Sequence, residues 1–148
     1  MKIIFGMGWP AGRSKLFKDS NAGELFKKYC DRIGKDFACE SKTINFEELF
    51  KVSGLIWVCE RSQKSRMYSS ADLAEQFQNV CDGGIKQLTI WIGGPDGVAK
   101  ENLEKLKPNL TWSFGPMTLP HELAAVVAAE QIYRAISILK NHPYHQGH

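Results

Sequence analysis

The sequence predicts a single-domain α/β fold in which a mostly parallel sheet is covered by helices on both faces. The chain has 148 residues, of which 43% are apolar and 24% charged, as in an ordinary soluble domain that buries its core without disulfides or metals. Short apolar runs alternate with segments of helical periodicity, which is typical of α/β proteins. Runs such as Leu55–Cys59 are continuously apolar, as in strands that are buried on both faces. We expect one domain over residues 1–148.

The first third of the chain predicts a strand, a helix and a second strand. Lys2–Gly6 is an apolar run ended by glycine, which indicates a buried strand that leads into a loop. Apolar residues recur at helical spacing over Asn21–Lys35, where Ser20 can cap the start and Gly34 suits the end. Asp36–Ile44 alternates loosely and is expected to be a strand.

The middle of the chain predicts a short helix, a strand and a second long helix. Asn45–Lys51 has the polarity of a short helix, and Leu55–Cys59 is the third strand. Ser69 or Ser70 can cap the helix that follows, because its apolar residues Leu73, Phe77 and Val80 share one face.

The last third predicts two strands and two helices. Leu88–Ile92 and Thr111–Phe114 are the fourth and fifth strands, separated by a short charged helix over Val98–Leu106. Glu122–Lys140 is the final helix, with an apolar stripe along its length.

Cysteines, histidines and apolar runs exclude several classes of protein. The four cysteines show no CxxC pair, which favours reduced thiols and a cytoplasmic location. The longest apolar run, Leu123–Ala129, is far shorter than the roughly 18 residues of a membrane span. His142, His145 and His148 are three residues apart, but Pro143 interrupts any helix and no carboxylate or cysteine is near. We therefore expect no membrane and no metal, and a frayed end is the simpler interpretation of the tail.

The net charge is only +3, but the basic residues are unevenly distributed. Residues 1–28 are rich in lysine, and Arg61, Lys64 and Arg66 form a second cluster. Both can be surfaces for a polyanion, although on charge alone lysines that merely solvate helices and loops are the better explanation.

Two loops are candidate ligand sites, because ligands of open α/β sheets bind beyond the carboxyl ends of strands. Gly93–Gly97 has three glycines in five positions, and Phe114–His121 is uncharged and contains two prolines. Such loops suit an adenine ring better than a phosphate chain. Each also has a plainer interpretation, a tight turn and a helix entry. Composition and spacing alone thus predict an α/β ligand-binding domain.

Several motifs taken together identify a family resemblance over residues 88–145. Leu88–Gly97, Trp112–Phe114 with Met117–His121, Glu130–Ala135 and Pro143–His145 resemble the ribosomal RNA large subunit methyltransferase H family of SPOUT, or α/β-knot, methyltransferases. Three departures are the short segment from Ser41 to Gly54, Cys59-Glu60 where an aspartate is common, and Gln146 in place of a basic residue.

The resemblance implies a homodimer with a C-terminal trefoil knot that binds S-adenosyl-L-methionine. It implies that the cofactor contacts Val58, Gly93 and the loop residues Phe114, Gly115, Pro116, Met117, Thr118 and Leu119. A cofactor without phosphates fits the glycine pair and the uncharged loop.

The resemblance also implies the reaction, which is methylation of N3 of a pseudouridine in 23S rRNA of the assembled ribosome. In this hypothesis His145 accepts the N3 proton or orients the base, Tyr144 stacks or hydrogen-bonds beside it, and Arg134 holds a phosphate. His121 is expected to fix the loop geometry, and the two basic clusters are expected to contact the RNA backbone.

Rival interpretations are a SPOUT enzyme for another RNA, a non-catalytic RNA-binding protein of the same fold, and a flavodoxin-like nucleotide-binding domain. The last would need phosphate-binding glycines after the first strand, where only Gly6, Gly8 and Gly12 are present.

Overall fold

The computed structural model describes residues 1–10, 15–60, 66–95 and 97–146, and shows the expected α/β fold. Six strands form one sheet in the order β2-β1-β5-β3-β6-β4, and every neighbouring pair is parallel. Their bounds are β1 Lys2–Gly8, β2 Ala38–Thr43, β3 Leu55–Cys59, β4 Arg66–Met67, β5 Gln87–Gly93 and β6 Leu110–Ser113. The two-residue edge strand β4 was not expected, because so short a segment has no periodicity to detect.

The helices lie where the sequence places them. They are α1 Ser20–Ile33, the 3₁₀ helix η1 Phe46–Lys51, α2 Ser70–Asp82, α3 Lys100–Leu106 and α4 His121–Leu139. Ser69 caps α2, as one of the two expected candidates. The expectation that Ser20 caps α1 is wrong. Asp19 caps the helix instead, because its carboxylate accepts hydrogen bonds from the backbone N–H groups of Asn21 and Ala22, and the helix begins at Ser20.

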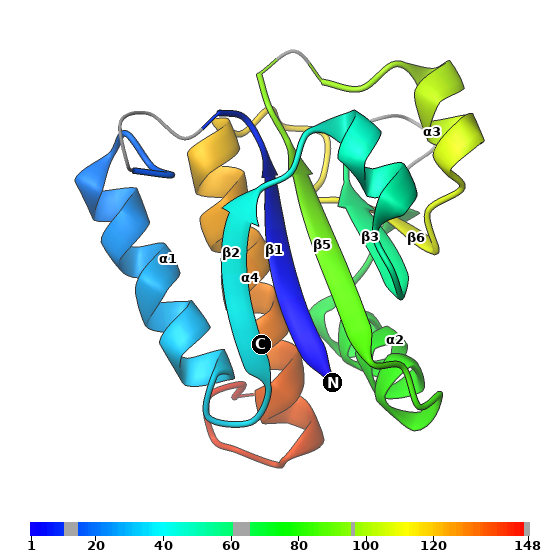
Figure 1. Cartoon of the computed structure of the whole chain (residues 1–148). Coiled ribbons are helices and arrows are strands. Elements are labelled where there is room, and N and C mark those ends of the chain that lie inside the picture. The colour runs from blue at the N-terminus through cyan, green and yellow to red at the C-terminus, as the bar shows by residue number, and fades with distance from the viewer. Residues whose placement is uncertain (11–14, 61–65, 96, 147–148) are drawn as a thin grey trace.

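Helices cover both faces of the sheet (Figure 1). On one face α4 packs between α1 and α2, and the larger core lies beneath them, with Phe5, Phe77 and Ile132 fully buried. On the other face η1 and α3 cover a smaller core that includes Leu49 and Trp91. The two cores make the sheet the middle layer of three, as its continuously apolar strands predict.

Small side chains bring α4 close to the sheet. Ala125, Ala128, Ala129 and Ala135 are completely buried. None of the helices in the described ranges is long and apolar enough to cross a membrane. The trefoil knot that the family resemblance implies stays a prediction.

Candidate functional site

A cleft of about 370 Å³ lies at the carboxyl ends of β3, β5 and β6, and we call it the first cleft. The start of α4 closes one side of it through His121 and Ala124. Both candidate loops contribute, since Gly93, Gly94, Pro95 and Gly97 form one wall, and Phe114, Gly115, Met117, Thr118 and Leu119 form another. The cleft therefore lies where ligands of parallel α/β sheets bind.

Glycine is needed in both walls of the first cleft. Gly97 and Gly115 have φ angles of 68° and 107°, which residues other than glycine rarely adopt. The Ser113 hydroxyl accepts a hydrogen bond from the Gly115 N–H at 3.2 Å, so the second wall is held at its base. The loops that the sequence singles out thus combine turn geometry with a ligand-sized hollow.

The lining of the first cleft suits a ligand without phosphates. None of its lining residues in the described part of the chain is Lys or Arg, and Glu60 is its acidic member. Trp112 and Phe114 supply aromatic surface, with ring centroids 4.8 Å apart in an edge-to-face pair. A flat heteroaromatic ring and a positively charged group fit these surroundings better than a phosphate chain does.

Two of the expected cofactor residues, Val58 and Pro116, do not line the first cleft. Val58 is fully buried in the smaller core, and its neighbour Cys59 lines the first cleft instead. Consecutive strand residues point to opposite faces, so the two side chains cannot share one surface. Pro116 is not among the lining residues, although both of its neighbours are.

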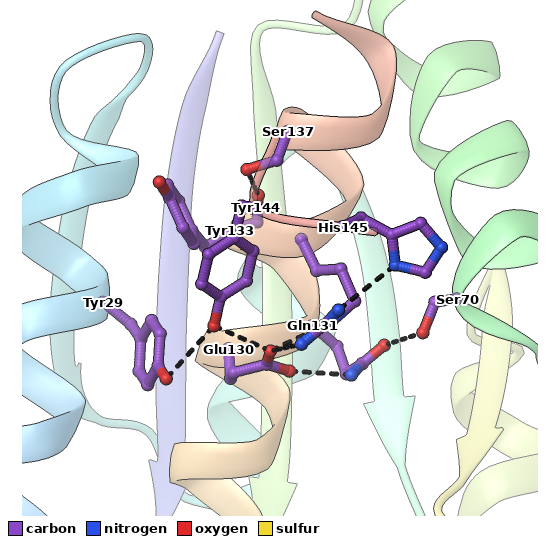
Figure 2. A network of polar contacts seen from close by, with 9 residues as sticks. Tyr29, Ser70, Glu130, Gln131, Tyr133, Ser137, Tyr144 and His145 are labelled. Carbon is purple, nitrogen blue, oxygen red and sulfur yellow. Dashed lines mark hydrogen bonds and ion pairs between the residues drawn. The ribbon is translucent and has the colours of Figure 1, made fainter. Parts of the chain in front are cut away.

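The C-terminal tail forms a second polar site on the middle of α4 (Figure 2). One oxygen of the Glu130 carboxylate accepts hydrogen bonds from Arg134 Nε at 2.9 Å, Arg134 Nη2 at 2.6 Å and the Tyr144 hydroxyl at 3.0 Å. Arg134 Nη1 lies 3.1 Å from His145 Nδ1. We call these four residues the tail cluster. The structure therefore brings together the three expected catalytic residues around a carboxylate.

Neighbouring elements fasten the tail cluster in place. The Tyr144 ring packs edge-on against Tyr133, and its hydroxyl lies 3.3 Å from that of Tyr29 on α1. Burial, reinforced by the hydrogen bonds to Tyr29 and Glu130, raises the pKa of Tyr144, so its proton is retained. The other Glu130 oxygen accepts from Gln131 at 2.7 Å, and Gln131 in turn accepts from Ser70 on α2.

Other expected polar sites are only partly described. Arg13, Arg61, Lys64 and His148 lie outside the described residues. Arg66 belongs to β4, and its guanidinium lies 4.9 Å from the Tyr68 ring centroid. Within the described ranges, no three His, Cys, Asp or Glu side chains come together as a metal site.

Comparison with known proteins assigns the family. The model described as "Predicted SPOUT methyltransferase" matches residues 15–145, which include both walls of the first cleft and the whole tail cluster. The chain belongs to the SPOUT methyltransferase family.

Several curated relatives of this SPOUT methyltransferase carry the name ribosomal RNA large subunit methyltransferase H. The Koribacter versatilis protein is 38% identical over 88% of this chain and 92% of its own length. The proteins from Methylocella silvestris and a Psychrobacter species are 35% and 42% identical, over 95% and 93% of this chain and 79% and 75% of their own lengths. A probable methylase family protein from Haemophilus influenzae shares the fold, with a TM-score of 0.55 at 12% identity over 99% of this chain and 70% of its own.

In this SPOUT methyltransferase, the first cleft and the tail cluster are separate within one chain. Ala124 lines the cleft, and Glu130 follows six residues further along α4, or about 9 Å at the α-helical rise. His121, unlike the residues of the tail cluster, lines the first cleft. The centroid of its ring lies 4.5 Å from that of the Trp9 ring.

Sequence reasoning missed several residues that the structure places at these sites. In the sequence, Glu130 belongs to a motif with no assigned role, and Tyr29 belongs to the first helix with no predicted polar contact. A carboxylate four residues before an arginine on one helix is a detectable ion-pair signal. The contact of Tyr29 with a residue 115 positions away is not visible in the sequence.

Proposed function

We propose that this chain transfers a methyl group from S-adenosylmethionine to N3 of a pseudouridine in 23S rRNA of the assembled ribosome, in the cytoplasm. The observation that carries the proposal is the first cleft, which is built from the family's motif loops and has no Lys or Arg in its described lining. The names of the curated relatives support ribosomal RNA as the substrate.

The first cleft fits the cofactor in size and chemistry. Its volume of about 370 Å³ is within the usual range of small-molecule sites. S-adenosylmethionine supplies a sulfonium-activated methyl group. Gly93 permits close approach of a ligand to the backbone, and the loop 114–119 offers main-chain polar groups.

The chain's own task in the reaction is to align the acceptor nitrogen and to remove its proton. His145 is the proposed proton acceptor or base-orienting group, with Tyr144 beside it and Arg134 on a phosphate. Because these side chains are apart from the first cleft of their own chain, we propose that they act in a homodimer, where the tail of one protomer reaches the cleft of its partner.

Two measurements on the purified protein test the proposal. Calorimetry should show binding of S-adenosylmethionine and of its demethylated product. Ribosomes from a strain that lacks this modification should accept a radiolabelled methyl group, and nucleotide mapping should locate it at N3 of a pseudouridine. Folded protein that binds neither ligand would overturn the enzymatic function, whereas methylation of a different RNA would overturn only the substrate.

A substitution at Gly93 locates the cofactor. A Cβ at this position would lie 3.5 Å from its nearest neighbour in Trp91, which is ordinary van der Waals contact. Gly93→Val should abolish cofactor binding because the added methyl groups, beside Trp91 and Val98, fill the space of the close backbone approach in the glycine wall of the first cleft. Lys86→Val, at the amino end of β5 and so at the opposite end of the sheet, is the control and should leave binding unchanged.

A further inference from the structure

A second cleft of about 430 Å³ adjoins the first one, at the carboxyl ends of β1 and β5. The two clefts share the Gly94-Pro95 segment, Gly97 and His121. Lys15 and Lys18 line only the second cleft, and we call it the lysine cleft. Its residues thus come from segments that are far apart in the sequence. Figure 1 shows that β1 and β5, whose carboxyl ends carry the cleft, lie side by side in the sheet.

The wall between the two clefts is thin. A Cβ on Gly94 would lie 2.8 Å from the backbone oxygen of Gly8, so the loop after β5 rests directly on the end of β1. A Cβ on Gly8 would lie 2.5 Å from the Trp91 ring. The main chain itself therefore separates the clefts at this point, and a molecule in one cleft lies next to a molecule in the other.

The lysine cleft is electropositive where the first cleft is not. Lys15 and Lys18 are exposed, and neither side chain forms an ion pair with any residue that the structure describes. Glu122 is the one acidic residue in the described lining. Its carboxylate already accepts hydrogen bonds from the backbone N–H groups of Lys18 and Asp19, at 3.2 and 3.0 Å. It also lies 3.8 Å from His121 Nε2. The two ammonium groups thus remain available to an anion.

The segment that carries the lysines is fixed to the shared wall. Trp9 Nε1 donates a hydrogen bond to the Leu16 carbonyl at 2.8 Å, and the Trp9 ring contacts both Phe17 and His121 edge-on. Trp9 is itself buried. The lysine backbone is therefore held in position beside His121, and only the side chains have to move to meet a ligand.

We infer that the lysine cleft binds the sugar-phosphate backbone of the RNA substrate next to the nucleotide that is methylated. This inference rests on the proposed function and names where its substrate is held. Lys15 and Lys18 contact backbone phosphates, and the thin wall places the neighbouring base within reach of the first cleft. The two clefts divide the chemistry between them, because the phosphate-free methyl donor occupies the uncharged cleft and the polyanionic acceptor the basic one.

The salt dependence of ribosome binding tests the inference. We would measure co-sedimentation of the full-length protein with unmodified ribosomes over a range of KCl concentrations at fixed Mg²⁺. Each phosphate contact contributes about 0.7–0.9 to the slope of log K against log salt. Lys15→Ala and Lys18→Ala should each flatten the slope by about that amount, and the double variant by about twice as much. Lys86→Ala, an exposed lysine at the amino end of β5, is the matched control and should keep the parental slope.

Each outcome decides one claim. A double variant with the parental slope would overturn the inference that the lysine cleft binds RNA. A control whose slope flattens as much as that of the variants would overturn it too. Calorimetry with S-adenosylmethionine and the melting temperature should be unchanged in all variants, which shows that the fold and the first cleft are intact. If the wild-type protein binds ribosomes through these lysines but transfers no methyl group, the proposed function fails and the lysine cleft stands.

Discussion

Gly54 and Gly84 show how the surroundings of a residue decide what its backbone angle costs. Both have positive φ angles, 84° and 69°. A Cβ on Gly54 would lie 2.2 Å from the backbone oxygen of Gln87, whereas nothing lies within 4 Å of one on Gly84. We expect Gly84→Ala to lower the free energy of unfolding by about 1–2 kcal/mol, which is the cost of a left-handed backbone. Gly54→Ala should lower the free energy of unfolding by clearly more, as measured by urea unfolding, because β5 must also shift to make room for the Cβ. Equal losses would contradict this.

The cysteines should differ in reactivity because their surroundings differ. A hydrogen bond from the Cys30 thiol lowers the pKa of Cys39, and burial raises the pKa of Cys59. The thiolate is the reactive form, and a lowered pKa keeps Cys39 ionised to a lower pH than an ordinary thiol. Iodoacetamide should therefore label Cys39 well before Cys59 near neutral pH, as measured by mass spectrometry. Cys30→Ser, which replaces the thiol that donates this hydrogen bond, is labelled beside the parent. If Cys59 reacts first in the folded parent, the lowered pKa assigned to Cys39 is wrong.

At the scale of elements, the carboxylate of Glu130 joins α4 to the tail that follows it. The tail turns back after α4, so His145 and Tyr144 lie beside residues 11 and 14 positions earlier in the chain. None of the residues of the tail cluster lines the first cleft. Loss of the tail should therefore separate catalysis from cofactor binding.

Two changes in the tail test this separation. His145→Ala should lower turnover on ribosomes by about 10²–10⁴-fold, as for a lost acid–base group, with nearly unchanged affinity for S-adenosylmethionine. Truncation before Pro143 should lower turnover at least as much, because it also removes Tyr144. Gln146→Ala, an exposed residue next to His145, is the control and should retain activity. Parental rates in both variants would show that the tail takes no part, and loss of cofactor binding in both would make it part of the cofactor site.

At the scale of the whole molecule, the separation of tail and cleft predicts a stable homodimer. Leu123 at the start of α4 is 45% exposed, and Met117 in the neighbouring loop is 73% exposed. Apolar side chains beside a cleft are suited to burial against a second copy. Light scattering should give twice the chain mass of 16.7 kDa, even in dilute solution.

Two exposed leucines distinguish this interface from the rest of the surface. Leu123→Glu should shift the population towards the monomer, because the charge would have to be buried. Leu25→Glu changes a leucine of similar exposure on α1 and should leave the dimer intact. A wild-type protein that stays at 16.7 kDa would contradict the homodimer.

The sequence by itself determined the three-layer α/β architecture, because its signals are local. Continuous apolar runs such as Leu55–Cys59 specify buried strands, and the amphipathic periodicity of Asn21–Lys35 specifies a helix. The glycine and proline loops after β5 and β6 were likewise recognisable as the walls of a ligand site. The motifs of residues 88–145 then pointed to the family that the comparisons show.

Only the tertiary structure decided which side chains meet. That Cys59 rather than Val58 faces the first cleft depends on the register of β3 in the sheet. Glu130, Tyr29 and Tyr144 meet because α1 and α4 pack together, and Lys15 and Lys18 form a cleft with β5 only once the strands are ordered. Such contacts join residues tens of positions apart, and their geometry follows from the packing of the whole chain, for which no local pattern in the sequence carries information.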